Sequence, residues 1–224
     1  ALYWNPIKTI DLTNNAQLEL LDVSYTTIKE LNLTHTPNLF CLRAYSDGFG
    51  DEDEGIAQLT SINVTNLPYL QYLDVKGNRI SSIDLSNNEM LTWAYLNDNE
   101  LENIDLSNNN DLEELNLGGN SLTSIDLSHN PFLTALNVEG NKLTTLDLSH
   151  NTRLKELSIA NNDIHSLDTS MLTGLRRLYI NGNGMSAEEL NDLYYILPER
   201  APDTPEEQNP GVGQVAYNLA VIQG

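Results

Sequence analysis

Apolar residues recur along this chain at a fixed interval of 21 residues. The residues that mark the interval are Ile62, Ile83, Ile104, Ile125, Leu146 and Leu167. Ile10 and Leu31 form an earlier pair with the same spacing, but the step from Leu31 to Ile62 is 31 residues long. A period of about 20 to 50 residues is typical of a solenoid, in which each repeat stacks on its neighbours. We therefore predict a solenoid whose regular stack is interrupted once.

The residue types within each repeat are also constant. One repeat shows the pattern L-x-x-L-x-L-x-x-N-x-L-x-x-L in the residues Leu154, Leu157, Ile159, Asn162, Ile164 and Leu167. This pattern resembles the consensus of the leucine-rich repeat family. The phrase I-D-L-S-N-N, from Ile83 to Asn88, resembles the 21-residue variety in secreted proteins of the Bacteroidetes and in internalin-like surface proteins. The resemblance extends from residue 1 to about residue 185, and it implies a fold more strongly than a function.

Alternating polar and apolar residues predict a short strand in every repeat. Leu157 and Ile159 alternate with Glu156, Ser158 and Ala160, which suits a strand with one buried face. Successive copies would stack about 4.8 Å apart as a parallel sheet. The return segment is too short for a full helix, so we expect short extended segments and turns on the convex side. The predicted fold class is a leucine-rich repeat solenoid with a curved parallel β-sheet on its concave face.

An asparagine follows the predicted strand in most repeats, where the chain turns inward. These residues are Asn78, Asn99, Asn120, Asn141, Asn162 and Asn183. A buried amide can donate and accept hydrogen bonds at once, so a column of amides can pair backbone groups that water does not reach. We interpret these asparagines as a structural ladder.

We predict a solenoid at 1–185, with about eight to nine repeats and an insertion at 46–58, followed by a C-terminal cap at 186–224. The chain starts inside a truncated repeat, so we expect part of the natural N-terminus, with any secretion signal, to precede it. The cap begins with Ser186 and Glu189, which have the spacing of a capping box, and Pro198 ends the helical run that follows. The apolar stretch 215–222 predicts one further strand.

The acidic composition narrows the range of partners. With 11 basic and 32 acidic residues, the chain has a net charge of -21 at pH 7. Nucleic acid is therefore excluded as a partner, because phosphate binding depends on Lys and Arg. A basic protein, a cation or a neutral carbohydrate stays open. The single cysteine, Cys41, excludes an intramolecular disulfide.

Aspartates form a second column, on the predicted convex surface. They are Asp11, Asp84, Asp105, Asp126, Asp147 and Asp168. Like charges stacked one strand apart repel one another unless each accepts a local hydrogen bond. A bound cation is the alternative, but we favour solvated or locally bonded carboxylates.

Side chains on the exposed face of the sheet differ along the chain. Aromatic residues gather on three adjacent repeats, beside a few charged residues: Tyr45, Tyr72, Trp93 and Tyr95, flanked by Arg43, Asp74 and Lys76. From Glu114 to Ala160 the equivalent positions are small or polar, and we interpret them as plain scaffold. Exposed aromatics beside charges have the composition of a binding hot spot, although sheet propensity alone also places aromatics on strands. We predict a ligand site at the aromatic residues.

The interruption of the period falls beside these aromatic residues. Its extra segment, 46–55, contains five carboxylates and three glycines, and insertions in repeat proteins often form loops on the binding face. We therefore add Asp47, Phe49 and Asp51 to the ligand-binding candidates. Calcium binding by Asp47, Asp51 and Asp53 is an alternative, since calcium prefers carboxylate oxygens, but the spacing does not match an EF-hand. We favour a solvated acidic loop that contacts a basic partner, and we predict no cofactor.

No group of residues predicts catalysis. The four histidines lie at outer turns rather than around one nucleophile, and the chain has neither a phosphate-binding loop nor a nucleophile elbow. The family resemblance implies a non-enzymatic recognition module, secreted or on a bacterial cell surface, that binds a protein partner through its concave face. We expect a monomer. The alternative is a carbohydrate-binding or adhesion protein in which Tyr72, Trp93 and Tyr95 stack on sugar rings.

Overall fold

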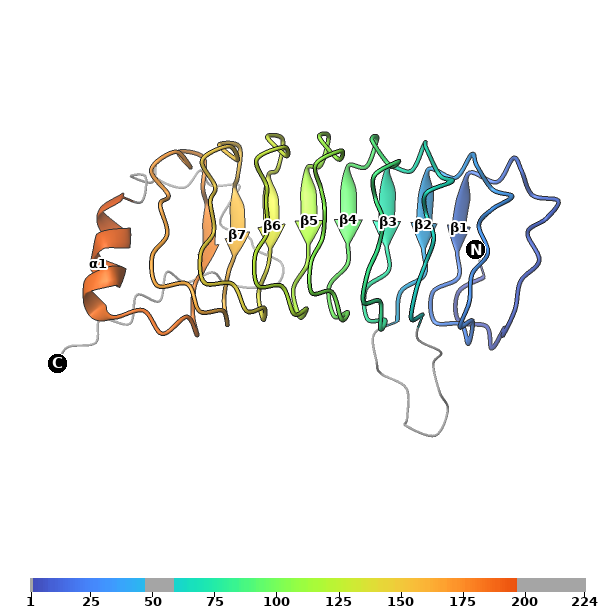
Figure 1. The fold of residues 1–224 in the computed structure, drawn as a ribbon, viewed down its shortest axis with the longest axis horizontal. Helices are drawn as coiled ribbons and strands as arrows, with labels where there is room; N and C mark the ends of the chain where they lie inside the picture. Colours follow the sequence, from blue (N-terminus) through green and yellow to red (C-terminus); the bar gives the residue numbers. More distant parts are fainter. Residues whose placement is uncertain (1, 47–58, 197–224) are drawn as a thin grey trace, which may run out of the picture.

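The computed structural model describes residues 2–46 and 59–196, in which eight short strands form one parallel sheet. The strands are β1 (Leu20–Asp22), β2 (Cys41–Arg43), β3 (Tyr72–Asp74), β4 (Trp93–Tyr95), β5 (Glu114–Asn116), β6 (Ala135–Asn137), β7 (Glu156–Ser158) and β8 (Arg177–Tyr179). Each strand pairs with the next one along the chain. Figure 1 shows the strands in a single row, with one coil of chain for each of them. The predicted leucine-rich repeat solenoid is confirmed.

The pairing register aligns the repeats position by position. Trp93 pairs with Glu114, and Tyr95 pairs with Asn116, as the 21-residue period requires. Across the insertion, Cys41 pairs with Tyr72. In β4, β5, β6 and β7 the central residue is buried while its two neighbours are partly exposed. The first and third residues of these strands therefore line the concave face.

Leucines from identical positions of successive repeats form one continuous core. Leu115, Leu136 and Leu157, the central residues of β5, β6 and β7, are each at most 2% exposed. Leu85 and Leu106, on the opposite side of the coil, are equally well buried. Because each repeat buries its apolar face against its neighbours, the core grows by addition along the stack. Burying one leucine side chain contributes about 1.5–3 kcal/mol.

The predicted asparagine ladder is present. The Nδ2 of Asn99 donates to the backbone oxygens of Val75 and Leu96, each at 3.0 Å, and its Oδ1 accepts from the backbone N–H of Ile80 at 3.0 Å. Asn120 makes the same three bonds one repeat later. Each amide thus joins two successive repeats through backbone groups that are buried from water.

A second asparagine ladder runs through the turns on the other side of the coil. Asn88, Asn109, Asn130 and Asn151 are fully buried. The Nδ2 of Asn109 donates to the backbone oxygens of Leu85, at 3.1 Å, and of Asn88, at 2.9 Å. The side-chain oxygens of these four residues have no hydrogen-bond partner in the described part of the chain. The sequence pattern predicts turns here, but it does not show that the amides point inward.

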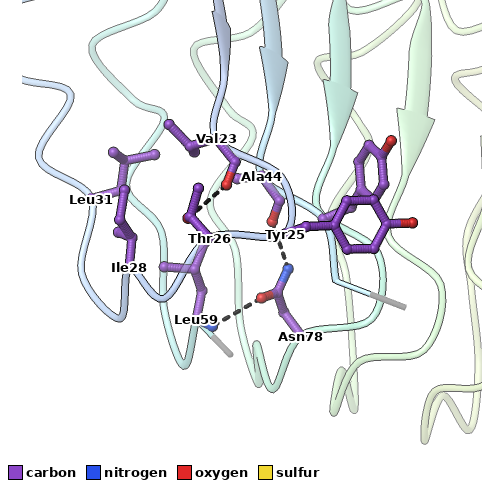
Figure 2. Close-up of a pocket in the computed structure, with 9 residues that line it drawn as sticks. Val23, Tyr25, Thr26, Ile28, Leu31, Ala44, Leu59 and Asn78 are labelled. Carbon is purple, nitrogen blue, oxygen red and sulfur yellow. Dashed lines mark hydrogen bonds between the residues drawn. The ribbon is translucent and has the colours of Figure 1, made fainter. Parts of the chain in front are cut away.

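Asn78 joins the two sides of the insertion (Figure 2). Its Nδ2 donates to the backbone oxygen of Ala44 at 2.9 Å, and its Oδ1 accepts from the backbone N–H of Leu59 at 2.9 Å. The chain therefore rejoins the regular stack at Leu59, and the sheet continues without a break from β2 to β3. The expectations for the insertion itself, including the calcium ligands, fall on 47–58, outside the described residues.

On the convex side, the aspartates are locally bonded, as we predict. The Oδ1 of Asp126 accepts from the backbone N–H of Ser128 at 2.9 Å. Hydrogen bonds from the backbone and side chain of Ser128 lower the pKa of Asp126. Asn32 and Asn63 occupy the same position in their repeats and accept the equivalent backbone bond. This position on the convex side therefore requires a side chain that accepts a hydrogen bond from a backbone N–H of the turn. The neutral amide of asparagine fulfils that role as well as the aspartate carboxylate does.

The helix α1 (Ala187–Ile196) follows the last repeat, and Figure 1 places it at one end of the stack. The capping box is confirmed, because the backbone N–H of Ser186 donates to the Glu189 carboxylate and the backbone N–H of Glu189 donates to the Ser186 hydroxyl. Leu193 is 4% exposed and joins the core. The expected strand at 215–222 lies outside the described residues.

Candidate binding face on the concave sheet

The concave face carries side chains in columns, because equivalent residues of successive strands lie next to one another. One column contains Tyr72, Trp93, Glu114, Ala135, Glu156 and Arg177. The adjacent column contains Arg43, Asp74, Tyr95, Asn116, Asn137, Ser158 and Tyr179. Strand spacing is about 4.8 Å, so neighbours within a column are in reach of each other.

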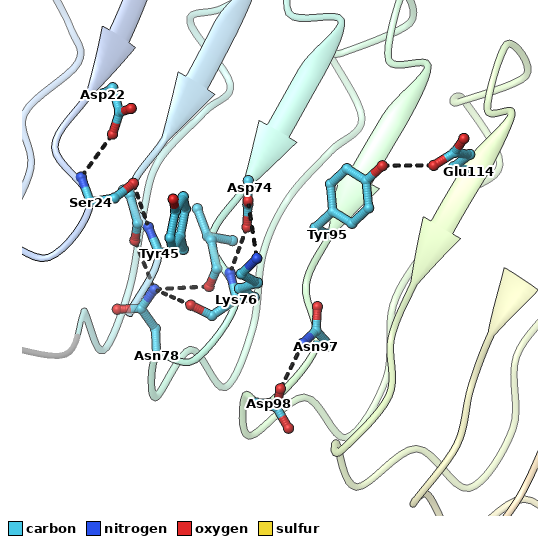
Figure 3. Close-up of polar contacts among 12 residues, drawn as sticks. Asp22, Ser24, Tyr45, Asp74, Lys76, Asn78, Tyr95, Asn97, Asp98 and Glu114 are labelled. Atoms are coloured by element: carbon cyan, nitrogen blue, oxygen red, sulfur yellow. Dashed lines mark hydrogen bonds and ion pairs between the residues drawn. The ribbon is translucent and has the colours of Figure 1, made fainter. Parts of the chain in front are cut away.

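Seven of the residues predicted from sequence lie together on β2–β4 and directly after these strands, and we call them the aromatic corner: Arg43, Tyr45, Tyr72, Asp74, Lys76, Trp93 and Tyr95. The guanidinium carbon of Arg43 lies 5.0 Å from the ring centroid of Tyr72. The rings of Tyr72 and Tyr95 have centroids 5.5 Å apart and are tilted by 44°. The hydroxyl of Tyr95 donates to the Oε2 of Glu114 at 2.7 Å (Figure 3). Burial raises the pKa of Tyr95, and this hydrogen bond raises it further.

Lys76 contacts both Tyr45 and Asp74 on the other side of the aromatic corner. Its Nζ lies 4.5 Å from the ring centroid of Tyr45 and 3.8 Å from the Oδ2 of Asp74. Asp74 is only 4% exposed although it belongs to the sheet face. Burial raises the pKa of Asp74, and the opposing effect of Lys76 offsets part of that shift. The charges of the aromatic corner are therefore largely paired with groups of the same chain.

Two further aromatic residues extend this corner and were not predicted. The rings of Trp4 and Tyr25 are stacked with centroids 4.4 Å apart, and Tyr25 meets Tyr45 edge-on at 5.1 Å. Both residues have positive φ, 60° for Trp4 and 53° for Tyr25. In later repeats this position is held by glycine, as in Gly77 with a φ of 69°, or by a small polar residue, Asp98 with a φ of 55° and Asn161 with a φ of 54°. A bulky side chain is strained there. The sequence signal was an aromatic residue directly before the asparagine position.

A hollow of about 200 Å³ lies beside the aromatic corner, over the later strands. We call it the carboxylate hollow. Its lining includes Glu114, Asn116, Ala135, Asn137, Glu156 and Ser158, with Tyr95 and Tyr179 as its aromatic members. The Glu156 carboxylate pairs with the guanidinium of Arg177. From the sequence these positions are expected to be plain scaffold, and their small and polar residue types do not reveal the hollow.

The structure thus brings together Arg43, Tyr45, Tyr72, Asp74, Lys76 and Tyr95 by direct contacts, and it places Trp93 between Tyr72 and Glu114 in its column. Asp47, Phe49 and Asp51 lie outside the described residues. Within residues 2–46 and 59–196, no group of three or more His, Cys, Asp or Glu side chains could hold a metal ion. The helix in this part of the chain is too short and too polar to cross a membrane.

Leucine-rich repeat proteins are similar to this chain in sequence and in structure. The leucine-rich repeat family model matches residues 129–145. The functional domain of InlJ from Listeria monocytogenes is 28% identical with a TM-score of 0.58, and the match covers 75% of this chain and 40% of that domain. Internalin C2 from the same species is 19% identical with a TM-score of 0.66, over 80% of this chain and 78% of that one. A search of curated protein sequences finds no significant match.

The period, the parallel sheet and these matches agree on a leucine-rich repeat fold. Within that fold, the 21-residue repeat is similar to the internalins, as we predict from sequence. This chain spans well under two thirds of the InlJ domain that it matches. The InlJ domain includes a cysteine ladder, whereas this chain has one cysteine and uses asparagine amides to join its repeats. The likeness is one of fold and repeat type.

Proposed function

We propose that this chain is a non-enzymatic recognition module that binds a protein partner through its concave face. Leucine-rich repeat solenoids present extended concave surfaces on which partners bind. The observation that carries the proposal is the aromatic corner, with Trp93 in the middle of the face. Aromatic and arginine side chains near the centre of an interface supply most of its binding energy.

The aromatic corner is also preorganised for binding. Arg43 is held against Tyr72, and Tyr95 is held by Glu114, so these side chains lose little conformational freedom when a partner arrives. Ordering a flexible side chain at an interface costs about 0.5–1.5 kcal/mol, and that cost is small where the side chain is fixed beforehand. The corner therefore favours a rigid, shape-matched contact.

The acidic segment 47–54 follows Ser46 directly in the sequence. The backbone N–H of Ser46, the last described residue before 47–58, donates to the backbone oxygen of Lys76 in the aromatic corner at 2.9 Å. We propose that Asp47, Phe49 and Asp51 contact the partner next to the aromatic residues. A net charge of -21 favours a partner with a basic surface, because opposite charge accelerates encounter.

The experiment is a binding screen of this chain against arrayed extracellular proteins and glycans, followed by substitution. Trp93→Ala is expected to abolish capture of the protein found and to leave the melting temperature nearly unchanged, since Trp93 is half-buried on the face. Phe132→Ala is the matched control, because Phe132 is an exposed aromatic that does not belong to the concave columns. Equal capture by Trp93→Ala and the unsubstituted chain would refute the aromatic corner as the binding site.

A carbohydrate-binding or adhesion function is the second candidate. Tyr72, Trp93 and Tyr95 lie on two neighbouring strands and are half-buried, an arrangement on which sugar rings could stack. A glycan is neutral, so its affinity should change little with salt, whereas an acidic face bound to a basic protein should lose affinity as screening rises. Binding measured at low and at high ionic strength separates the two candidates.

We also propose an extracellular or bacterial cell-surface location and a monomeric state. The internalin-like fold supports the location. Light scattering on the purified chain tests the oligomeric state, and a calcium titration followed by calorimetry tests whether Asp47, Asp51 and Asp53 bind the ion.

A further inference from the structure

We propose that the carboxylate hollow takes an arginine side chain from an extended, basic segment of the partner. This inference rests on the proposed function and specifies the chemistry of the partner at a second place on the concave face. The hollow shares Tyr95 with the aromatic corner, and Glu114 in its lining accepts a hydrogen bond from the Tyr95 hydroxyl; the remaining lining residues lie outside the corner.

A gap between two carboxylates is the central observation. Glu114, Ala135 and Glu156 are paired in register on β5, β6 and β7, so they stand side by side on the face. Adjacent strands are about 4.8 Å apart, which separates the bases of the two glutamates by about 10 Å. The methyl group of Ala135 leaves the space between them open, and that space belongs to the hollow of about 200 Å³.

The next column supplies hydrogen-bond donors to the floor of the hollow. The Oδ1 of Asn116 accepts from the backbone N–H of Gly118 at 3.1 Å, and the Oδ1 of Asn137 accepts from that of Glu139 at 2.9 Å. The oxygen of each amide is therefore engaged. Their NH₂ groups donate no hydrogen bond within the described part of the chain, so they stay available to carbonyl oxygens of a bound peptide.

The negative charge of the two glutamates favours a cationic side chain in the hollow. The carboxylates are the acceptors that border the gap, and a buried or half-buried carboxylate favours a cationic donor. Glu114 is oriented by the Tyr95 hydroxyl at 2.7 Å. Glu156 is paired with Arg177, but both side chains are more than 40% exposed. An exposed ion pair is worth only about 0–1 kcal/mol, so an incoming cation can share Glu156 with Arg177.

Arginine fits the hollow better than lysine does. Its planar guanidinium carries five donors in a fixed fork, which can reach carboxylates on two sides, and it stacks on aromatic rings. Tyr95 and Tyr179 line the hollow together with the glutamates. The same lining would hold a lysine ammonium by charge alone, without the stacking.

The probe is an acetylated pentapeptide with a central arginine between glycines, titrated into isotopically labelled protein and followed by NMR. The matched probe carries citrulline, which has the same shape and no charge, in place of arginine. We expect saturable shifts of the Ala135 methyl and of the Asn116 and Asn137 side-chain amides with the arginine peptide. The apparent affinity of the citrulline peptide, obtained from the same shifts, should be at least tenfold weaker.

Substitutions then test whether the arginine peptide binds in the carboxylate hollow or is attracted by the overall negative charge of the protein. Glu156→Gln and Ala135→Leu are expected to weaken the arginine peptide tenfold or more, the first by charge and the second by filling the gap. Glu113→Gln is the matched control, because Glu113 precedes Glu114, is exposed and does not line the hollow. Circular dichroism of each variant checks that the repeats remain folded.

Equal weakening by Glu113→Gln, or equal shifts with both peptides, would overturn the inference in favour of diffuse charge attraction. Shifts confined to other parts of the protein would also overturn it. Loss of the protein partner in Trp93→Ala, with no response of the hollow to arginine, would leave the proposed function standing and remove only this inference.

Discussion

The same leucine core and the same amide ladder run along strands β2–β8, but the concave surface over strands β2–β4 differs from that over strands β5–β8. In the aromatic corner, Arg43 lies on Tyr72, Lys76 lies on Tyr45, and the side chains fill the face with contacts to each other. In the carboxylate hollow, Ala135, Asn137 and Ser158 occupy the equivalent positions and leave a volume of about 200 Å³. One scaffold therefore presents a packed surface and an open one.

The comparison shows that side-chain size and pairing, rather than backbone shape, create the two surfaces. The register is continuous through both, from Arg43 opposite Asp74 to Asn137 opposite Ser158. In a solenoid each repeat contacts only its neighbours, so a substitution on one surface should leave the other surface intact.

The largest effect is expected in the ladder that both surfaces share. Asn99 follows β4, which carries Trp93 and Tyr95 of the aromatic corner, and Asn141 follows β6, whose Ala135 and Asn137 line the carboxylate hollow. Each is replaced by alanine. Each substitution leaves one buried backbone N–H, that of Ile80 or of Leu122, without its partner. It also removes one of the two amide donors at each of two backbone oxygens, which keep the amide of a neighbouring repeat. A buried unpaired group costs about 1–3 kcal/mol, and each lost hydrogen bond contributes about 0.5–1.5 kcal/mol. We expect each variant to lose about 3 kcal/mol or more of the free energy of unfolding, measured by urea denaturation.

Asn116→Ala is the control for this experiment, because Asn116 is a half-buried asparagine on the face that accepts a single bond from Gly118. It should lose no more than about 1 kcal/mol. Clearly unequal losses for Asn99→Ala and Asn141→Ala would show that the scaffold itself differs between the two halves.

A smaller loss of the free energy of unfolding is expected when one tyrosine is removed from the aromatic corner or from the carboxylate hollow. Tyr72→Ala loses the guanidinium of Arg43 and the ring of Tyr95. Such contacts contribute about 0.5–1.5 kcal/mol for an aromatic pair and about 0.5–1 kcal/mol for a cation on a ring, so we expect a loss of about 1–2 kcal/mol. Tyr179→Ala, at an exposed end of the hollow with 38% exposure, should lose less than about 0.5 kcal/mol.

Thermal unfolding of both variants, with Tyr72→Phe as the control that keeps the ring, measures this difference. Equal losses at the two positions would contradict the distinction between a packed corner and an open hollow.

The repeat made most of the fold predictable, because a period of 21 residues fixes which positions stack. The ladder through Asn99 and the local bonding of Asp126 follow from residue type and position alone, and both are present. The aromatic residues of the corner could be assigned to one face from the alternation. Their mutual contacts depend on rotamers, which the pattern does not contain.

The hollow escaped prediction for a different reason. Ala135 and Ser158 mark it by lacking bulk, and a small residue looks the same in a sequence whether it is inert or borders a cavity. Trp4 and Tyr25 escaped because their positive φ shows only when their position is compared with that of Gly77 in a later repeat. The buried amide of Asn109 escaped because an asparagine in a turn usually faces water.

The smallest effect concerns Asp74, a buried carboxylate of the aromatic corner. Asp74 lies in the column where the hollow has Asn116 and Asn137, so Asp74→Asn gives the corner the residue type of the hollow. Burial raises the pKa of Asp74 above its ordinary value of 3.8, with Lys76 and Arg43 opposing that shift and Asp22 adding to it. Because the folded pKa is the higher one, the contribution of Asp74 to stability is complete below pH 3.8 and falls as pH rises through the folded pKa.

The variant lacks this titration, so its stability relative to the unsubstituted chain should increase as pH rises above 3.8 and then level off once Asp74 is charged in the folded state. Melting temperatures of both proteins across the acidic range measure the difference. Asp126→Asn should show the opposite trend, because hydrogen bonds from Ser128 lower the pKa of Asp126: its carboxylate contributes stability above pH 3.8 that is lost as pH falls through the folded pKa. A parallel pH dependence of the two variants would mean that Lys76 and Arg43 outweigh burial at Asp74, and that the charge of the corner stabilises its packing instead of opposing it.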